Sequence, residues 1–583
     1  MAELPDISSP KDLRWGRDPF LDAWLLHFMT ENNLEHLLNP LHNASPEQLR
    51  FMVALEEDQV FAPCSDELFS QLFQPETPGE LLKAYAVSWR VVARLIRNHV
   101  EDSYSRRRIY QFCRHRFRQA LAARISIPSR VTKRLATIVM TQTGLEDPFR
   151  EVKQAYNRRA KKLLDSPLLD GLINQCPEER LVCLRLQDLR WELDMLELRR
   201  LFALSSTLDI WGENDDMPSA EHLRSILAMP CSEFDRIHQV FGPQQNEPKT
   251  ILYLPNSSGG VMFDLMIIRS LLRQGHYVIL ALKAGFYFQT PTIWDVECDP
   301  VLAEALRGAH VLLKGDMTKN ELLKTLREHR FLVISDGTRE RLNLYRVSVT
   351  FARAWKEADV VLAKGDPHFR RLISNSHEFT RDVLCFYADE QGGFHLAYKP
   401  KSANVRKFSE SDLRDLADGI ISDMRIAKST GKRVMFYSAI VGSIPGQTKA
   451  AIRILNTFVA HLRSRLQDVM VINPAEHFVP GMDGDDLMFM WERVQRSGLI
   501  DVWRFQSVAD IDKSFELLGE KVPPVWIGKD ATFSTGCTKE MHIALDVQRS
   551  QPELQIIGPS AEKFFRRREY GVGKYFDASI EYQ

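Results

Sequence analysis

The sequence predicts a mixed α/β protein: a helical N-terminal region, then a doubly wound and mostly parallel sheet, then a second C-terminal α/β domain or extension. Three observations carry this prediction. Apolar residues recur at three- and four-residue spacing up to about residue 245, strand and helix patterns alternate from Lys249, and the alternation begins again near residue 410.

The helical pattern is clearest in LKAYAVSWRVVARLIRNHV, where apolar residues fall on one face of a helix. From Lys249, TILYLPNSSGG is a short apolar strand that ends in small polar residues and glycines. The helix VMFDLMIIRSLLRQG and the strand HYVILALKAG follow, which together predict a βαβ unit and a parallel sheet. Further strands are expected at AHVLLKG, FLVISDG and ADVVLAKG, and ligands of such sheets bind at the carboxyl ends of the strands.

The C-terminal region predicts strands at GKRVMFY, DVMVINP, DVWRFQ, PPVWIG and LQIIGP, with helices between them. Its loop before TKAAIRIL resembles a phosphate loop only superficially, because Lys449 follows Thr448 and so breaks the Walker A order. Cys537 begins a helix, where a thiol can be activated; a buried, unreactive cysteine is the favoured interpretation. We expect a helical extension at 1–95, a helical part of the central domain at 96–245, an α/β site domain at 246–408 and a C-terminal α/β domain at 409–583.

The composition excludes several protein classes. The net charge is −1, from 76 basic and 77 acidic residues, which gives no global reason to expect nucleic acid or an anionic membrane as a partner. The eight cysteines form no CxxC pair, which argues against a zinc knuckle and is typical of reduced thiols. The N-terminus lacks an apolar signal segment, and no window of 18 apolar residues suggests a membrane span. We therefore expect a cytoplasmic protein.

One segment, DSYSRRRIYQFCRHRFRQALAAR, is strongly basic with interleaved aromatic residues. One interpretation is a patch for RNA or phosphate. The favoured one is the solvated face of an amphipathic helix with Tyr110, Phe112 and Phe117 facing inward, because acidic segments elsewhere cancel the charge.

Four polar clusters follow predicted strands. In LPNSSGGVMFD, residues Ser258, Gly259 and Gly260 at a helix start suit an anion such as phosphate, although an ordinary capped turn explains the same residues. In PTIWDVECD, three carboxylates within five residues suit a hard cation such as magnesium, and a solvated polar loop is the alternative. The other two clusters contribute Ser335 and Gly337 from ISDGTRERLNL, and Lys364 and Asp366 from ADVVLAKGDPHFRRL.

The shared position of the four clusters says more about function than any single cluster does. Phosphate-binding backbone, carboxylates and a lysine all follow strands of one sheet, and metal-assisted phosphoryl chemistry needs that combination. Lys364 is expected to bind phosphate as a point charge.

The sequence from about residue 100 to 405 resembles the damage-control phosphatase family, also called the acidic-residue methyltransferase-like or domain-of-unknown-function 89 family. Four collinear segments carry the resemblance: TGLEDPFREVKQAYNRRA, ILYLPNSSGGVMFDLMII, PTIWDVECDP and LNLYRVSVTFARAWKEADVVLAKGDPHFRRL. The resemblance implies a divalent metal held by the loop and by the acidic position of the third segment. By position, the ligands are Asn256, Ser257 and Asp295, while Lys364 contacts phosphate and Asp366 follows it.

This sequence departs from the family pattern in its metal-binding loop. Gly260 stands where the family has Glu. Asn256 stands where the family has Asp and Ser257 where it has Asn, so the pair of loop ligands loses one negative charge. Glu297 would restore that charge if its side chain reaches the same cavity.

The resemblance implies a phosphatase that depends on a divalent ion such as magnesium, manganese, cobalt or nickel and acts on a small phosphorylated metabolite, with Asp295, Lys364 and Asp366 as catalytic residues. The alternative is a catalytically degenerate protein of the same fold that binds a ligand or regulates. Carboxyl methyl transfer ranks last, because no glycine-rich cofactor fingerprint follows the first strand.

Overall fold

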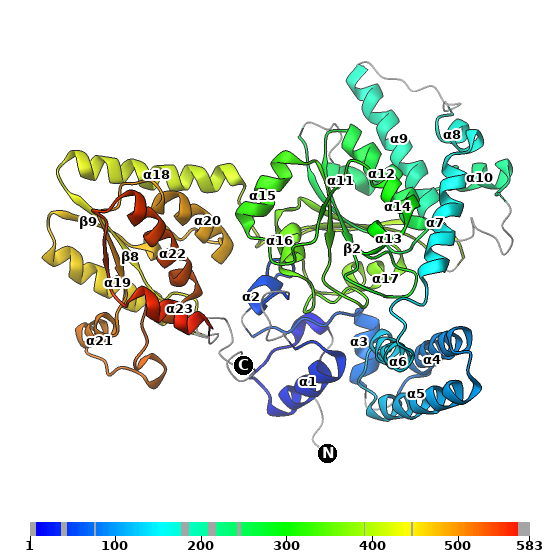
Figure 1. Cartoon of the computed structure of the whole chain (residues 1–583), viewed down its shortest axis with the longest axis horizontal. Helices are drawn as coiled ribbons and strands as arrows, with labels where there is room; N and C mark the ends of the chain where they lie inside the picture. The colour runs from blue at the N-terminus through cyan, green and yellow to red at the C-terminus, as the bar shows by residue number, and fades with distance from the viewer. Residues whose placement is uncertain are drawn as a thin grey trace. The chain divides into compact units, whose positions relative to one another are not determined.

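The computed structural model describes residues 7, 9–35, 43–56, 58–74, 77–175, 186–207, 217–231, 233–241, 247–389, 391–444 and 447–569. The chain forms two compact units, Met1–Ser402 and Ala403–Gln583 (Figure 1). The predicted fold class is confirmed: an α/β unit with a helical N-terminal part precedes a second α/β unit.

The N-terminal part of the first unit is helical, as predicted, and its described residues contain no strand before Thr250. Several helices begin at capping residues, since the side chains of Asp18, Ser65 and Asp102 accept backbone N–H groups. The helices are α1 (Pro19–Asn32), α2 (Pro46–Leu49), α3 (Asp66–Phe73), α4 (Gly79–His99), α5 (Ser103–Ala123), α6 (Pro128–Thr143), α7 (Arg150–Leu164), α8 (Pro167–Ile173), α9 (Leu186–Ser206), α10 (Ala220–Leu227) and α11 (Ile237–Phe241).

The sheet of the first unit has the strand order β3-β4-β2-β1-β5-β6-β7 and is parallel except for β7. Its last two strands form an antiparallel hairpin that the sequence reasoning missed. The strands are β1 (Thr250–Leu254), β2 (Tyr277–Leu282), β3 (His310–Leu312), β4 (Phe331–Ser335), β5 (Val360–Lys364), β6 (Asp382–Ala388) and β7 (Phe394–Lys399). The helices between them are α12 (Gly260–Arg273), α13 (Asp295–Cys298), α14 (Pro300–Ala305), α15 (Lys319–Glu328), α16 (Val349–Glu357) and α17 (Asp366–His368).

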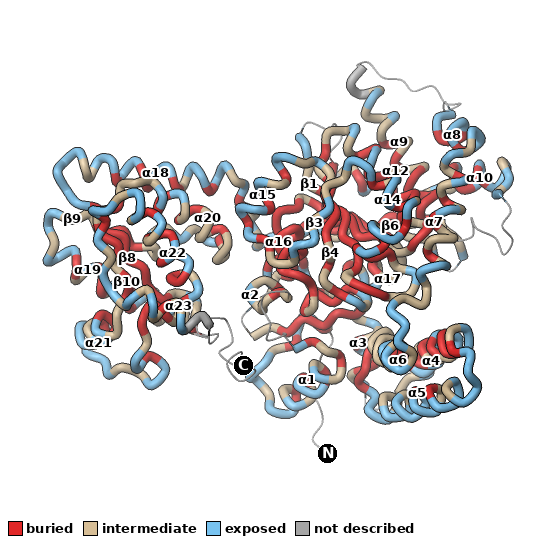
Figure 2. The backbone as a smooth tube through the Cα atoms, in the orientation of Figure 1, coloured by how far each residue is buried: buried red, intermediate tan, exposed pale blue. Residues whose placement is uncertain are grey.

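Apolar side chains cover both faces of this sheet, and buried residues form a continuous layer around its strands (Figure 2). Alternate residues of β1 serve different cores. Leu252 and Leu254 join the core that includes α16 and the N-terminal helices, whereas Ile251 and Tyr253 join the core that includes α9 and α12. Because β1, β2, β4 and β5 are parallel, the loops that follow them meet at one edge of the sheet.

The second unit contains a four-stranded parallel sheet with the order β11-β10-β8-β9. Its strands are β8 (Arg433–Ser438), β9 (Val469–Ile472), β10 (Val502–Phe505) and β11 (Gln555–Ile557). Its helices are α18 (Glu410–Ser429), α19 (Thr448–Arg465), α20 (Gly484–Gln495), α21 (Val508–Leu517), α22 (Thr535–Ser550) and α23 (Ala561–Glu569).

The strand predicted at PPVWIG is wrong: Pro524–Trp526 forms a single 3-10 turn. Two consecutive prolines remove two backbone donors, so the segment cannot join a sheet ladder. Val525 and Ile527 are correspondingly exposed.

The described cysteines are free thiols, whereas Cys176 and Cys183 lie outside the described residues. Within the described ranges, no helix has the length and apolar character needed to cross a membrane.

Candidate functional site

The loop from β1 to α12 lies against the end of β5. Gly365 has φ 92°, and a Cβ there would lie 2.8 Å from Nδ2 of Asn256, so the Asn256 side chain packs on the Gly365 backbone. A Cβ at Gly260 would lie 2.7 Å from Nζ of Lys364 and 2.9 Å from Oγ of Ser257. An ammonium and a hydroxyl therefore face the first turn of α12, and only a glycine leaves room for both.

Lys364 is buried and held by a buried carboxylate. Its Nζ lies 2.8 Å from Oδ1 of Asp264, and the exposed fractions of the two side chains are 4% and 0%. Ser205 of α9 donates a hydrogen bond to the same oxygen. Burial and the Asp264 charge raise the pKa of Tyr253, on β1, well above its usual value. Asp264, which the sequence reasoning did not select, thus fixes the position of the predicted phosphate-binding lysine.

Two loop amides predicted to bind substrate already donate within the protein. Ser258 N donates to the carbonyl oxygen of Gln289 at 2.8 Å, and Gly259 N donates to Oδ1 of Asn157 at 2.6 Å. Gly259 has φ 77°, and a Cβ there would lie 3.0 Å from Cβ of Tyr156. As the N-cap of α12, Gly259 supplies no side-chain cap. Val261 N and Met262 N also donate within the loop, to the carbonyl oxygens of Ser257 and Gly259. The start of this 14-residue helix therefore offers an anion its positive dipole end rather than a set of free amides.

Asp295 is engaged by a buried lysine. Nζ of Lys153 lies 2.8 Å from Oδ1 and 2.6 Å from Oδ2 of Asp295, and 2.6 Å from Oδ2 of Asp147. Thr292 donates to Oδ2 of Asp295 through its backbone N–H at 2.7 Å and its hydroxyl at 3.0 Å. The Lys153 side chain is 1% exposed, so its charge has been removed from water and is balanced by the two carboxylates.

The other carboxylates of this segment are placed differently. Glu297 is exposed on α13, and no contact joins it to Asn256 or Ser257 in the described chain. Asp299 is buried, caps α14 and accepts a hydrogen bond from Nδ2 of Asn157 at 2.8 Å.

The predicted metal ligands do not form a donor set that fits a divalent cation. Asn256 and Ser257 are neutral and lie beside Lys364, an ammonium. Both oxygens of Asp295, the buried carboxylate of the predicted set, are bound by Lys153. Across the described ranges, no group of three His, Cys, Asp or Glu side chains is arranged to hold a metal ion.

The turn after β4 is rigid. Gly337 has φ 83° and packs on the Ser348 backbone, and its N–H donates to Oγ of Ser335 at 3.1 Å. Next to this turn, Nζ of Lys283 lies 2.6 Å from Oδ2 of Asp336. Ser335 and Gly337 therefore shape the edge of the sheet, and Lys283 adds a buried ammonium that the sequence reasoning missed.

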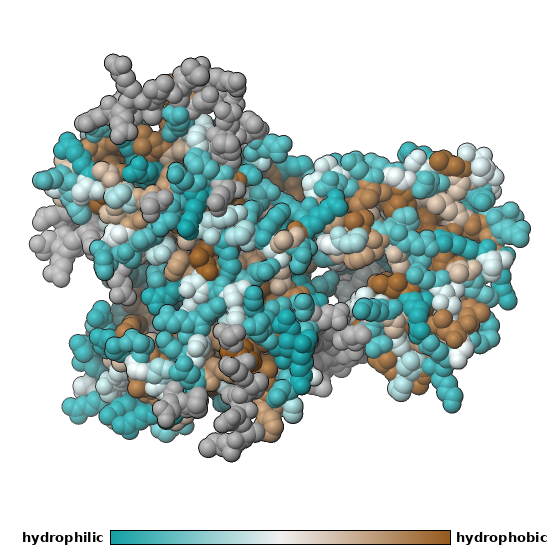
Figure 3. Space-filling view, turned by 180° about the vertical axis from the view of Figure 1, so that it is seen from behind, coloured by the Kyte–Doolittle hydropathy of each residue, from teal (hydrophilic) through white to brown (hydrophobic). Residues whose placement is uncertain are grey.

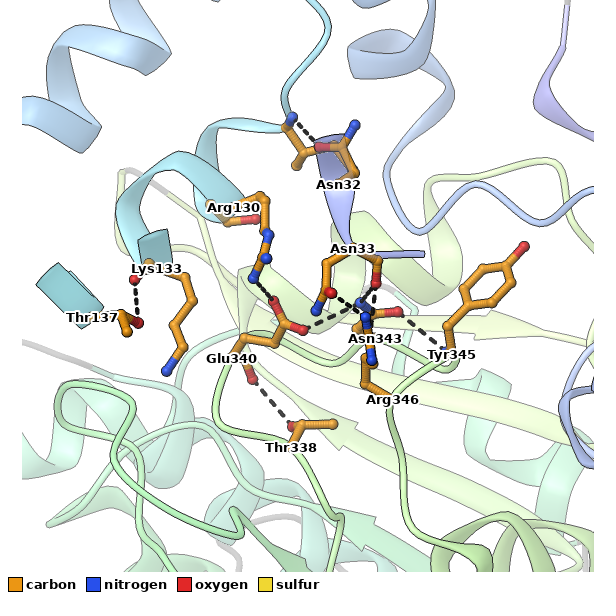
Figure 4. A network of polar contacts seen from close by, with 12 residues as sticks. Asn32, Asn33, Arg130, Lys133, Thr137, Thr338, Glu340, Asn343, Tyr345 and Arg346 are labelled. Atoms are coloured by element: carbon orange, nitrogen blue, oxygen red, sulfur yellow. Dashed lines mark hydrogen bonds and ion pairs between the residues drawn. The ribbon is translucent and has the colours of Figure 1, made fainter. Parts of the chain in front are cut away.

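The loop after this turn is tied to the N-terminal helices (Figure 4). Nη1 of Arg130, on α6, lies 3.4 Å from Oε2 of Glu340. Asn343 donates to Oε1 of the same carboxylate at 3.3 Å, and Arg346 donates to the carbonyl oxygen of Asn33 at 3.1 Å. These contacts fix the helical region against the edge that carries the site.

The remaining predicted residue, Asp366, lies at the surface. Its side chain is 44% exposed and pairs with Arg370 at 2.9 Å, one helical turn later. The neighbouring His368 is buried and donates from Nδ1 to the carbonyl oxygen of Lys364 at 2.9 Å. Burial lowers the pKa of His368 to about 4, so this imidazole is neutral at pH 7.

In the second unit, Cys537 is buried and its Sγ lies 3.3 Å from the carbonyl oxygen of Ala439. Burial raises the pKa of the Cys537 thiol well above its usual value, which does not suit a nucleophile. Lys449 is exposed at the start of α19.

Comparisons with known proteins find a family model and a solved structure that are similar to part of this chain. The family model described as "Damage-control phosphatase ARMT1-like domain" matches residues 83–388, just over half of the chain. Among solved structures, a DUF89 family protein from Pyrococcus horikoshii is similar over 54% of this chain and 96% of that chain, with 18% sequence identity and a TM-score of 0.39. No curated protein sequence matches this chain.

Proposed function

Because the chain belongs to the damage-control phosphatase ARMT1-like family, we propose that it is a phosphatase-like protein that acts on a small phosphorylated metabolite. The phosphate group binds at the start of α12, between the Lys364 ammonium and the Ser257 hydroxyl. Ser335 and Gly337 shape the neighbouring edge of the sheet, and Asp366 stays a predicted catalytic residue.

A single observation supports the phosphate position best. Lys364 and Ser257 both face the point where Gly260 lacks a side chain. Buried Asp264 restricts the movement of Lys364, so little conformational entropy is lost when the ammonium binds an anion. The helix dipole of α12 adds a favourable interaction of about 0.3–1 kcal/mol.

Members of the family depend on metal in general. The donor set of this chain does not fit a divalent ion, so we assign no step to a metal here. The contribution of the chain's own residues is binding and orientation: Lys364 donates to the phosphate, while Lys153 and Thr292 hold the Asp295 carboxylate in one position.

A second candidate function is ligand binding or regulation without catalysis. The contact between Lys153 and Asp295 favours it, because a carboxylate already bound by an ammonium is a poor metal ligand and a poor base. Asn256 and Ser257 favour it as well, because a neutral amide and a neutral hydroxyl bind a divalent cation more weakly than a carboxylate does.

The test combines turnover with thermal stabilisation. The purified chain is assayed with sugar phosphates and an aryl phosphate, with and without magnesium, manganese, cobalt or nickel, and its melting temperature is measured with the same ligands. We expect a ligand-dependent rise in melting temperature. Gly260→Ala should abolish that rise, because the added methyl group occupies the space beside Lys364 and Ser257.

Gly171→Ala is the matched control, since a Cβ at this helical glycine meets no atom within 4 Å. Turnover that is lost in Asp295→Ala supports the phosphatase. Stabilisation without turnover under any metal condition supports the binding protein, and the absence of both contradicts the proposed site.

A further inference from the structure

The helices α4 and α5 carry a concentration of positive charge that the net charge of the chain conceals. Residues 79–123 contain ten Lys or Arg and three Asp or Glu, whereas the whole chain has a net charge of −1. The helix α5 alone has six arginines and no acidic residue. The acidic residues that balance the total therefore lie elsewhere in the chain.

The arginines form a stripe on each helix. On α4, Arg90, Arg94 and Arg97 are exposed at positions i, i+4 and i+7, which lie on one face. On α5, Arg107, Arg114 and Arg118 are exposed at positions i, i+7 and i+11, again on one face. No carboxylate in the described part of the chain forms an ion pair with any of these six side chains.

The packing of α4 against α5 defines where the two helices meet. The ring of Trp89 lies 5.1 Å from Tyr110 and 5.2 Å from Phe117, measured between centroids. Phe112, which the sequence predicted to face inward, is instead 42% exposed. It lies on the side of α5 away from Trp89. Of the three aromatic residues predicted to face inward, only Tyr110 and Phe117 do so.

The helix α6 covers one side of this α4–α5 contact. Ser88 of α4 donates to the carbonyl oxygen of Pro128, and Sγ of Cys113, on α5, lies 3.9 Å from the carbonyl oxygen of Leu135. Figure 1 shows the three helices side by side.

Helical geometry places both arginine stripes on the side opposite α6. At about 100° per residue, Arg90 and Arg97 lie on one side of Trp89, and Ser88 lies on the other. By the same count, Arg107 and Arg114 lie on the side of Tyr110 away from Cys113. The six arginines therefore lie on one exposed face of the α4–α5 pair, on both sides of the line where the two helices meet, and we call this face the arginine groove. From behind, hydrophilic side chains gather over this bundle (Figure 3).

We propose that the arginine groove binds the phosphodiester backbone of single-stranded nucleic acid. Arg107 and Arg118 are about 16 Å apart along the helix axis, a span that requires an extended polyanion rather than a small metabolite. Arginine binds phosphate oxygens with two parallel hydrogen bonds. Tyr104, 73% exposed at the start of α5, offers a ring on which a base can stack.

The observations favour nucleic acid over a membrane surface. Along the arginine stripe of α5 the exposed residues are arginines, Gln111 and His115. On α4, Leu82 and Val87 are exposed singly among charged residues and do not form the continuous apolar face with which a helix inserts among acyl chains. The groove lies on the helical bundle and does not use the phosphate site at Lys364, so this proposal stands or falls independently of the proposed function.

The test measures fluorescence anisotropy of a labelled 20-nucleotide oligouridylate with the full chain at 0.05–0.3 M KCl. The wild type should bind with an affinity that falls steeply with salt. Replacing Arg107, Arg114 and Arg118 together by Gln should reduce the salt slope by about 2 and weaken binding about 50-fold at 0.15 M salt, because each lost phosphate contact on a single strand removes about 0.7 from the slope.

The control variant replaces Arg307, Arg425 and Arg465 by Gln, which removes the same charge from exposed positions outside the groove. Unchanged binding of the control supports the proposal, as does similar binding of oligothymidylate, since the backbone is the recognised group. The proposal is overturned if both triple variants weaken binding equally, if the wild type does not bind, or if only phosphatidylserine vesicles or polyglutamate bind at the groove.

Discussion

Lys153→Met is expected to destabilise the first unit strongly. Lys153 Nζ lies 2.6 Å from carboxylate oxygens of both Asp147 and Asp295, whose side chains are 12% and 9% exposed. Methionine is unbranched and only one atom shorter than lysine, and it removes the charge. Two largely buried carboxylates then face each other without a counter-charge, and the loss of one partner from such an arrangement costs about 3–5 kcal/mol.

This free energy converts into a measurable shift in melting temperature. Unfolding entropy is about 2.1 cal/mol/K per residue, so a unit of about 400 residues changes its melting temperature by roughly 1 °C for each 0.8 kcal/mol. The expected fall is therefore about 4–6 °C for the transition of the first unit, measured by differential scanning calorimetry of the full chain.

Lys161 provides a matched control on the same helix. It also lies near two carboxylates, Asp165 at 3.3 Å and Glu304 at 3.6 Å, but its side chain is 37% exposed. Lys161→Met should cost less than about 1 kcal/mol. A triple variant that combines Lys153→Met with Asp147→Asn and Asp295→Asn should recover most of the loss, because no buried charge is left. The reasoning is refuted if Lys153→Met costs no more than Lys161→Met.

Two further perturbations test other parts of the first unit. Burial lowers the pKa of His276 to about 4, below its value of about 6.5 in the unfolded chain; its contribution to stability is therefore complete above pH 6.5 and is lost as the pH falls towards 4. Between pH 7 and pH 5 this group should account for about 2 kcal/mol of the fall in the free energy of unfolding. Urea unfolding should therefore show that the free energy of unfolding of His276→Gln depends less on pH than that of the wild type. An equal dependence on pH in the two proteins would contradict this. Gly337→Ala should destabilise by more than about 2 kcal/mol, because its Cβ would collide with the backbone nitrogen of Ser348 at a φ of 83°. Gly308→Ala shares the positive φ but meets no atom within 4 Å, so equal losses for the two alanine variants would exclude the collision as the cause.

The sequence predicted those features that depend on local order along the chain. The strands β1 to β5 and the helical N-terminal region have strong apolar periodicities, and parallel strands bring their following loops together. This is why Asn256 and Lys364 could be expected at one edge, as the structure shows.

Other features depend on contacts between distant segments. Lys153 lies 142 residues before Asp295, and nothing in the pattern of α7 distinguishes a buried lysine from a solvated one. In the same way, the sequence of the loop does not predict that Gly259 N donates a hydrogen bond to Asn157. The prediction that Phe112 faces inward was wrong. Aromatic residues two positions apart on a helix point to different sides, and the side that is buried is the one that contacts Trp89 of the neighbouring helix.

The contact of Asn256 with Gly365 has a topological origin. After β1 the chain passes to β2 and then outward to β3 and β4, whereas β5 lies on the opposite side of β1. The connections thus leave β1 and β5 in opposite directions, and the carboxyl ends of these two strands form the switch point at which such sheets bind their ligands. Strand order determines where this switch point lies, and the residues that follow the strands do not. Substitutions such as Asn256 and Ser257 can therefore change its chemistry without moving it.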